Sequence, residues 1–127
     1  MDIGIDLGTS NVLVYVKGRG VVINQPSVVA YEKSSKRIIA IGNKAKKMIG
    51  KTPESIEVVR PLVKGVVSDY IVTERMLKAF IRSAMEKRTG VGRPKICVCV
   101  PSGVTEVERR AVEEAVYRTG AKSVYVM

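Results

Sequence analysis

With 22 lysines and arginines against 12 aspartates and glutamates, the 127-residue chain carries a formal net charge of +10. Its composition, 46% hydrophobic and 27% charged, excludes a disordered chain, and no run approaches the roughly 18 consecutive apolar residues that a membrane-spanning helix needs. The length predicts one domain with one core, and the N-terminus lacks a secretory leader, so we expect a cytoplasmic protein. The positive charge favours an anionic partner such as nucleotide, acidic lipid or nucleic acid.

The first part of the chain predicts an antiparallel meander. Apolar and polar residues alternate over residues 2–7, 11–17 and 20–24, and short turn segments separate these runs. Three consecutive strands joined by tight turns are therefore expected.

The middle of the chain predicts a small second unit. Residues 28–31 and 37–41 flank a polar turn and indicate a hairpin, and residues 56–60 indicate another strand. Between them, Asn43 is a candidate N-cap for a short basic helix that runs to Ile49.

The last part of the chain changes to a helical period. Apolar residues recur at helical spacing from Ile71 to Met85, with Ser68 or Asp69 available as the N-cap. A strand at 96–100, a helix at 105–118 that Gly120 ends, and a strand at 123–127 follow.

The order strand, helix, strand implies a parallel pair with a right-handed crossover, added to the antiparallel meander. The predicted fold class is therefore α/β, a mixed sheet of the ribonuclease-H type with flanking helices and a small inserted subdomain. We expect residues 1–30 and 67–127 to form one subdomain and residues 31–66 the insertion. The last strand stays apolar to Met127 with no covering element after it, so we expect the chain to be cut from a longer one.

Cys97 and Cys99 alternate with valines in an apolar run. A strand would point both thiols to one face in a geometry unsuited to a disulfide, and the chain has no histidine to complete a metal site. We therefore expect two small, buried, unbridged side chains.

The turn between the first two predicted strands carries the candidate chemistry. Gly8 removes a side chain that would block an anion, so backbone amides can point at a phosphate, and Thr9, Ser10 and Asn11 add short side-chain donors. Asp6 would repel phosphate unless a cation lay between them, so it is better placed to hold Mg²⁺ through water. By itself, Asp-x-Gly-Thr is more typical of a plain hairpin turn than of a phosphate site, because aspartate and glycine are common in such turns.

The segment GIDLGTSN at 4–11 resembles the first phosphate loop of the superfamily of actin and the DnaK-type chaperones. Further stretches resemble the MreB/Mbl family of bacterial actins, namely NQPSVVA at 24–30, MIGKTP at 48–53, RPL at 60–62 with GVV at 65–67, and VPSGVTEVERR at 100–110. The resemblance covers essentially the whole chain in order. Ser10 departs from it, since the family more often has alanine there.

This resemblance implies part of the first half of an actin fold, in which ATP and Mg²⁺ lie in a cleft between two halves. Asp6, Gly8, Thr9, Ser10 and Asn11 would contact the nucleotide or its metal. The second phosphate loop, the adenosine-binding segments and the acidic residue that positions water are all absent, so no catalytic residue is assigned. A full-length protein would be an ATPase, whereas this chain alone should be inert, because phosphoryl transfer needs charge stabilisation from all sides.

The resemblance also implies filaments that organise cell-wall synthesis and rod shape together with the elongation machinery, at the inner face of the cell membrane. Loop 89–93 lacks the bulky apolar pair that some relatives insert into the membrane, although four basic residues around it, Lys87, Arg88, Arg93 and Lys95, could attract anionic headgroups. A solvated loop is an equal alternative.

Val107 falls outside the apolar stripe of its predicted helix, which Ala111, Val112, Ala115 and Val116 define. In MreB-like filaments this helix resembles the one that pairs antiparallel protofilaments, so Val107 is a candidate self-contact. A lone exposed valine is also ordinary on protein surfaces.

Three alternatives to a filament-forming ATPase remain. A DnaK-type chaperone has a nearly identical first loop, and a sugar kinase is a more distant relative. A basic module for lipid or nucleic acid is the non-enzymatic alternative, but one phenylalanine and five tyrosines offer little base stacking, so we expect no nucleic-acid partner.

Overall fold

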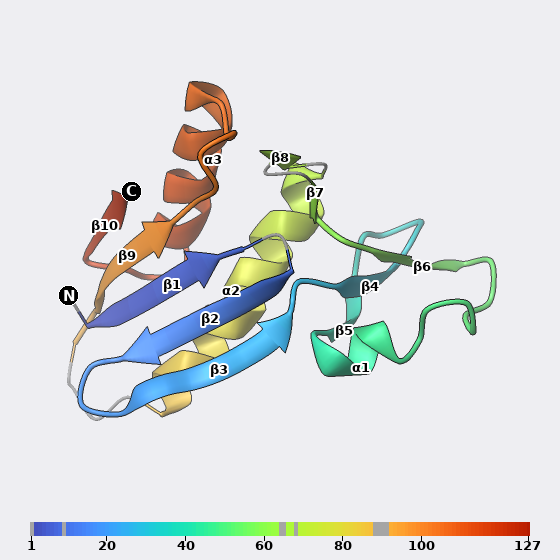
Figure 1. Ribbon diagram of the computed structural model, residues 1–127, viewed down its shortest axis with the longest axis horizontal. Coiled ribbons are helices and arrows are strands. Elements are labelled where there is room, and N and C mark those ends of the chain that lie inside the picture. The colour runs from blue at the N-terminus through green and yellow to red at the C-terminus, as the bar shows by residue number, and fades with distance from the viewer. Residues whose placement is uncertain (1, 9, 64–65, 68, 88–91) are drawn as a thin grey trace.

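The computed structural model describes residues 2–8, 10–63, 66–67, 69–87 and 92–127. Its largest element is a five-stranded sheet in the order β10-β9-β1-β2-β3 (Figure 1). The five strands are β1 (Ile3–Leu7), β2 (Asn11–Val16), β3 (Gly20–Pro26), β9 (Lys95–Cys99) and β10 (Ser123–Val126).

This sheet combines two pairing modes. β1, β2 and β3 form an antiparallel meander, whereas β9 pairs with β1 and with β10 in parallel. Ile5 at the centre of β1 lies opposite Val14 on one side and Val98 on the other. The predicted meander, the parallel pair and the mixed α/β class are all confirmed.

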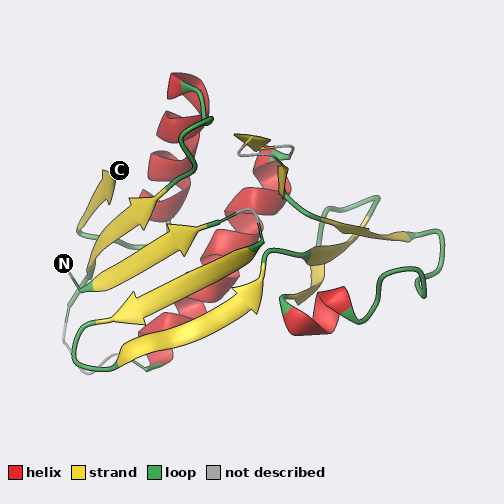
Figure 2. Ribbon diagram, viewed as in Figure 1, coloured by secondary structure: helices red, strands yellow, loops and turns green. Residues whose placement is uncertain are grey.

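Two long helices cover one face of the sheet (Figure 2). They are α2 (Tyr70–Glu86) and α3 (Glu106–Tyr117). Asp69 caps α2 by accepting a hydrogen bond from the Val72 amide at 3.1 Å, and Ser68, the other predicted cap, lies outside the described residues. Thr105 caps α3, with Glu108 completing a capping box.

The main core lies between this sheet face and the helices. Alternate residues of β1, β2 and β9 point into it, as the side-chain period of two requires. They meet the apolar stripe of α2, and the fully buried side chains include Ile5, Val14, Val98, Met76 and Leu77. Each such side chain stabilises the fold by about 1.5–3 kcal/mol through removal of apolar surface from water.

The opposite face of the sheet is not covered by either long helix. Leu13, Tyr15, Cys97 and Cys99 border a shallow hollow on this face. Both cysteines are free and only half-buried, so the prediction of buried thiols is wrong, although the absence of a disulfide is confirmed. The reason is the pleat: Ile96 and Val98 of β9 fill the helix-covered face, which sends the cysteines to the other one.

A second sheet lies beside the first one. It has the order β5-β4-β6 and consists of β4 (Val29–Glu32), β5 (Ile38–Ile41) and β6 (Ile56–Val59). The short helix α1 (Asn43–Lys46) packs beside it, and a two-stranded ribbon of β7 (Leu62–Val63) and β8 (Val66–Val67), which the sequence did not predict, leads back toward α2 (Figure 1).

The N-cap of α1 differs from the prediction. Gly42 occupies the cap at a φ of 66° and makes no side-chain cap hydrogen bond, while Asn43 is the first helical residue and the helix ends at Lys46. The Asn43 amide is satisfied instead by Gln25 of β3, whose Oε1 accepts it at 2.8 Å. A Cβ at position 42 would lie 2.3 Å from that Oε1 atom, so the contact requires glycine.

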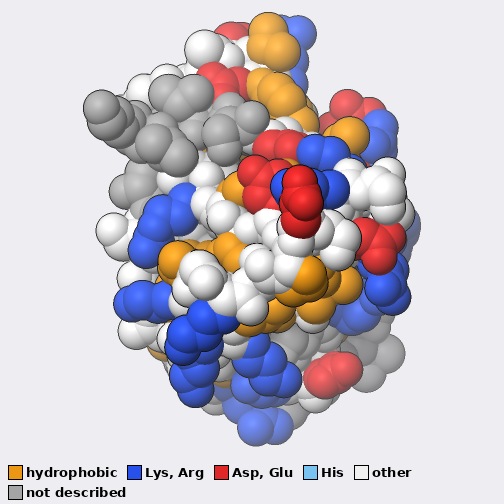
Figure 3. All heavy atoms as spheres, turned by 90° about the vertical axis from the view of Figure 1, so that its right-hand side faces the viewer, with side chains coloured by type: hydrophobic (Ala, Val, Ile, Leu, Met, Phe, Trp, Pro, Cys, Tyr) orange, Lys and Arg blue, Asp and Glu red, His pale blue; other side chains and the backbone are white. Residues whose placement is uncertain are grey.

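The second sheet has little apolar core of its own. Val28, Ala30 and Ala45 form a small buried cluster, whereas Val29 and Tyr31 join the main core. The two sheets share buried residues, so burial alone draws no boundary between them. The insertion boundaries at residues 31 and 66 therefore stay a prediction. Figure 3 views the molecule from this end and shows lysine and arginine side chains mainly on its lower part, with most acidic side chains above them.

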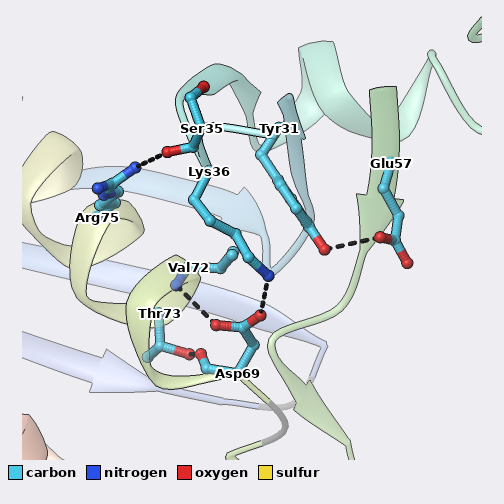
Figure 4. Close-up of polar contacts among 8 residues, drawn as sticks. All are labelled: Tyr31, Ser35, Lys36, Glu57, Asp69, Val72, Thr73 and Arg75. Carbon is cyan, nitrogen blue, oxygen red and sulfur yellow. Dashed lines mark hydrogen bonds and ion pairs between the residues drawn. The ribbon is translucent and has the colours of Figure 1, made fainter. Parts of the chain in front are cut away.

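Polar contacts tie the second sheet to the start of α2 (Figure 4). Lys36, at a left-handed φ of 60°, places its Nζ atom 3.0 Å from the Asp69 carboxylate and 4.9 Å from the centre of the Tyr31 ring. The Tyr31 hydroxyl donates to Glu57 at 2.8 Å, and Arg75 donates to the Ser35 carbonyl at 3.0 Å. The contact between Lys36 and Asp69 joins residues 33 positions apart, which no local pattern in the sequence indicates.

Candidate functional site

The turn between β1 and β2 is held by its own backbone. The Gly8 amide donates to the Asn11 carbonyl at 3.1 Å, and a Cβ on Gly8 would lie 2.7 Å from that same oxygen. Real side chains do not approach backbone so closely, so glycine is required by the turn itself. This is a structural reason for Gly8 that holds whether or not an anion binds.

Two further contacts fix the start of β2 against β3. The Ser10 carbonyl accepts the Ser27 amide at 2.8 Å, and the Asn11 amide group donates to the Asn24 side chain at 2.9 Å. The side chains of Ser10 and Asn11 are exposed. Thr9, the remaining predicted donor, lies outside the described residues. These two contacts therefore hold the turn in place, while the side chains of Ser10 and Asn11 face solvent.

The turn lies where open α/β sheets bind ligands. β1, β9 and β10 are parallel, so their carboxyl ends meet at one edge of the sheet, and the turn follows β1 at that edge (Figure 1). Ligands of such sheets lie outside the carboxyl ends of the strands. This position is the geometric property that the phosphate-loop prediction needs.

Asp6 is separated from the other predicted residues by the pleat. Its side chain is exposed on the uncovered sheet face, opposite Leu13 and Cys99 in register. There it borders the shallow hollow, of roughly 350 Å³, whose other walls are almost entirely apolar. An apolar hollow does not suit a triphosphate, so this hollow is not a candidate phosphate site.

The described residues around Asp6 could hold a magnesium ion weakly, but they do not form a metal centre in advance of binding. Among the described residues, no group of three or more histidine, cysteine, aspartate or glutamate side chains comes together. Mg²⁺ keeps most of its waters and is commonly held through one or two carboxylates plus substrate phosphates. Asp6, as one exposed carboxylate with phosphates supplying the remaining ligands, fits that pattern.

A thiol and a buried hydroxyl lie near the turn, and of the two only the hydroxyl was not singled out from the sequence. Burial raises the pKa of the Cys99 thiol, and the neighbouring Cys97 and Asp6 raise it further, so this thiol is a poor nucleophile. Ser27 is fully buried next to the turn, and its hydroxyl has no hydrogen-bond partner among the described residues. A serine following Pro26 in an apolar stretch gave no signal of this in the sequence.

No described helix is suited to span a membrane. None combines the length and the apolar character that crossing a bilayer requires. Lys87, Arg93 and Lys95, predicted to attract headgroups, are exposed, and Arg88 lies outside the described residues.

The fold defines the class first. The structure aligns with the MamK double helical filament at a TM-score of 0.71 over 98% of this chain and 39% of that one, with 23% identity, and with MreB5 of Spiroplasma citri bound to ADP at a TM-score of 0.84 and 39% identity. The latter match covers 98% of this chain and 37% of that one. The chain is therefore part of an actin-like fold.

The sequence comparisons then define the family. A family model described as MreB/Mbl protein matches residues 1–127. The cell shape-determining protein Mbl of Bacillus subtilis (strain 168) is 48% identical over 125 residues, covering 98% of this chain and 37% of Mbl. The cell shape-determining protein MreB of Escherichia coli (strain K12) is 45% identical over 130 residues, covering 99% of this chain and 38% of that protein. The chain belongs to the MreB/Mbl family and spans little more than a third of the length of these relatives.

Proposed function

We propose that the full-length protein is an ATP-binding bacterial actin homologue whose filaments organise cell-wall synthesis and rod shape. The observation that carries this proposal is the turn between β1 and β2. Backbone hydrogen bonds hold this turn in place where the carboxyl ends of the parallel strands meet. Relatives named as cell shape-determining proteins support the cellular role. Solved structures of Spiroplasma citri MreB5 bound to ADP and to AMPPNP support nucleotide binding.

In this proposal the turn binds the phosphates. Backbone amides of the turn and the exposed Ser10 and Asn11 would hold the nucleotide tail, with Asn11 using the amide hydrogen that Asn24 does not accept, and Gly8 keeps the turn tight. Thr9 is proposed as a further donor. Asp6 would hold Mg²⁺ through water, and the bound ion would neutralise charge on the phosphate oxygens.

Hydrolysis needs residues outside this chain. One turn grips a triphosphate from a single side, while phosphoryl transfer depends on positioning and electrostatic stabilisation around the whole group. We therefore propose that ATP turnover belongs to the full-length protein and that the 127-residue chain alone shows none above background.

Self-association would use the exposed part of α3. Val107 is 73% exposed and borders an apolar groove of about 200 Å³ between α2 and α3, with Tyr70 and Ala111 on its walls. An exposed valine beside an apolar groove is a suitable contact for a second protofilament. Replacing Val107 with Glu should weaken filament pairing, while Glu113→Gln on the same helix should not; unchanged double filaments of Val107→Glu would reject this contact.

The remaining partners follow from the proposed role. The filaments would act with the cell-wall elongation machinery at the inner face of the membrane. Lys87, Arg88, Arg93 and Lys95 are proposed to contact anionic headgroups.

The test of the nucleotide site uses full-length protein and a fluorescent ATP analogue. Binding should depend on Mg²⁺, and Asp6→Asn should weaken binding in the presence of Mg²⁺ far more than in its absence. Glu113→Gln, an exposed carboxylate substitution on α3, is the matched control. Equal effects of Asp6→Asn with and without Mg²⁺ would refute the assigned role of Asp6.

Electron microscopy of the full-length protein with ATP separates the proposed function from its alternative. Filaments are expected. Peptide-stimulated ATP turnover without filaments would instead favour a chaperone of the DnaK type.

A further inference from the structure

A groove of roughly 530 Å³ lies between the two sheets, next to the C-terminal half of α2. β3 and β5 line two of its sides, while Phe80 of α2, Lys87 at the C-cap of α2 and Lys44 of α1 line the others. The groove lies apart from the turn between β1 and β2, and the proposed nucleotide site does not use it.

The edges of two strands border this groove, and on the β3 side the Nζ atom of Lys87 donates to the Val22 carbonyl at 3.4 Å. All four residues of β5 line it. Since successive side chains of a strand point to opposite faces, a strand that borders a groove with every residue presents its edge and not one face. β5 is the edge strand of the second sheet and β3 is the edge strand of the first, among the strands described. Pro26 at the end of β3 also suits an edge strand.

The walls of the groove are apolar with a basic rim. Seven of its twelve described lining residues are apolar, including Phe80 at its base and Ile39, which is 39% exposed. Lys44 and Lys87 supply its charge, and no aspartate or glutamate is among the described residues that line it.

This combination selects one kind of occupant. Exposed strand edges bind extended peptides by strand addition, with main-chain hydrogen bonds giving affinity and side-chain pockets giving specificity. A flat bilayer does not enter a concave groove, and a single buried aromatic ring offers no stacking surface to nucleic-acid bases. Two lysines without a carboxylate between them complement acidic side chains.

We propose that this groove binds an extended segment of a partner protein, in which apolar residues alternate with acidic ones, as an added strand on the edge of β5. The apolar side chains lie against Phe80 and Ile39, and the acidic ones face Lys44 and Lys87. Four residues of β5 support a paired length of roughly 13 Å, so the recognised segment is short.

The test is a selection from a display library of random twelve-residue peptides against the full natural chain, followed by anisotropy titration of the enriched peptides. Enriched peptides should alternate apolar and acidic residues. Lys44→Glu with Lys87→Glu should weaken their binding by at least about tenfold, because both rim charges are reversed. The neutral pair Lys44→Gln with Lys87→Gln should give a smaller loss.

Matched controls come from the same two helices. Lys46 on α1 and Lys78 on α2 are exposed but do not line the groove, so Lys46→Glu with Lys78→Glu should leave binding within about twofold. Equal losses in the two double variants would overturn the proposal, since general charge would then explain binding. So would enrichment of peptides without acidic residues, or failure to enrich any peptide.

Binding to vesicles of phosphatidylglycerol distinguishes an anionic lipid surface from an acidic peptide as the partner of this groove. Because Lys87 is also proposed to contact headgroups, the vesicle comparison uses Lys44 alone. The proposal predicts that Lys44→Glu weakens peptide binding but leaves any vesicle binding no weaker than Lys46→Glu does. Vesicle binding that depends on Lys44, without peptide binding, would assign the surface to lipid and overturn the proposal.

Discussion

The two sheets of this protein are held by different forces. The five-stranded sheet is fixed by a large core, in which Ile5, Val14 and Leu77 are almost completely buried. The second sheet has only a small cluster of its own around Val28; Val29 and Tyr31 join it to the main core, and polar contacts such as that between Lys36 and Asp69 add to this. Apolar burial is non-directional and large, whereas a partly exposed ion pair contributes little and depends on geometry. The main core therefore supplies most of the stability, and the polar contacts help to set the orientation of the second sheet.

The largest expected effect comes from matched core substitutions. Val14→Ala should cost about 2–3 kcal/mol, because it loses two methyl groups of burial and leaves a cavity in a well-packed core. Val28→Ala should cost about half as much, because the small cluster near the surface can relax. Urea unfolding monitored by circular dichroism measures both. Equal losses of unfolding free energy, or a larger loss for Val28→Ala, would contradict the stated difference between the two sheets.

The next effect comes from Asp69, which joins the two regions. Asp69→Ala removes the cap of α2 and the contact with Lys36, and the lost cap alone should cost about 1 kcal/mol. Lys36→Met keeps the cap and should therefore cost less. Hydrogen exchange should accelerate in the turn around Ser35 in both variants, but at the start of α2 only in Asp69→Ala. Faster exchange at the start of α2 in Lys36→Met would show that the cap depends on the ion pair.

The same residue predicts a pH dependence. Burial alone would raise the pKa of the Asp69 carboxyl, but the hydrogen bond from the Val72 amide and the ammonium of Lys36 together hold this pKa below its ordinary value. The unfolded chain then binds more protons, so the stabilisation is present above the ordinary aspartate pKa of about 3.9 and is lost as pH falls through the folded pKa. Asp69→Ala should flatten the acid side of the stability profile. An unchanged profile would contradict the account.

The smallest effect is expected at Ser27. Its buried hydroxyl lacks a partner among the described residues, and such a group contributes no net stability to the folded state. Ser27→Ala should leave the melting temperature unchanged or raise it slightly. A clear decrease in melting temperature would show that the hydroxyl has a partner, such as an ordered water.

The elements with strong periodicity were predictable from the sequence. Alternation gave the meander of β1 to β3, and helical spacing after residue 70 gave α2 with Asp69 as one of two candidate caps. Local chemistry decides these features, because each depends on residues within a few positions along the chain.

The features that were predicted wrongly or not at all depend on residues far apart in the sequence or leave no sequence pattern. Gly42 is the cap of α1 because Gln25, in another strand, satisfies the Asn43 amide. The half-exposure of Cys97 and Cys99 depends on which sheet face the helices cover. The ribbon of β7 and β8, with two residues in each strand, is too short to leave a period in the sequence.

The position of the candidate site was predictable from the sequence, but the physical reason for each of its residues was not. The sequence placed Gly8, Ser10 and Asn11 in the turn after the first strand, where the structure has them. It explained Gly8 by the approach of an anion, whereas the close Asn11 carbonyl already requires glycine. The pleat, which turns Asp6 onto the uncovered sheet face, follows from alternation, but the apolar hollow beside it comes from three other strands and Met127.

A crystal structure of the full-length protein with Mg²⁺ and a non-hydrolysable ATP analogue tests the central claim most directly. The account predicts phosphate oxygens within hydrogen-bond distance of the backbone or side chains of the turn between β1 and β2, with Mg²⁺ linked through water to Asp6. Phosphates bound elsewhere, with this turn open to solvent, would contradict it.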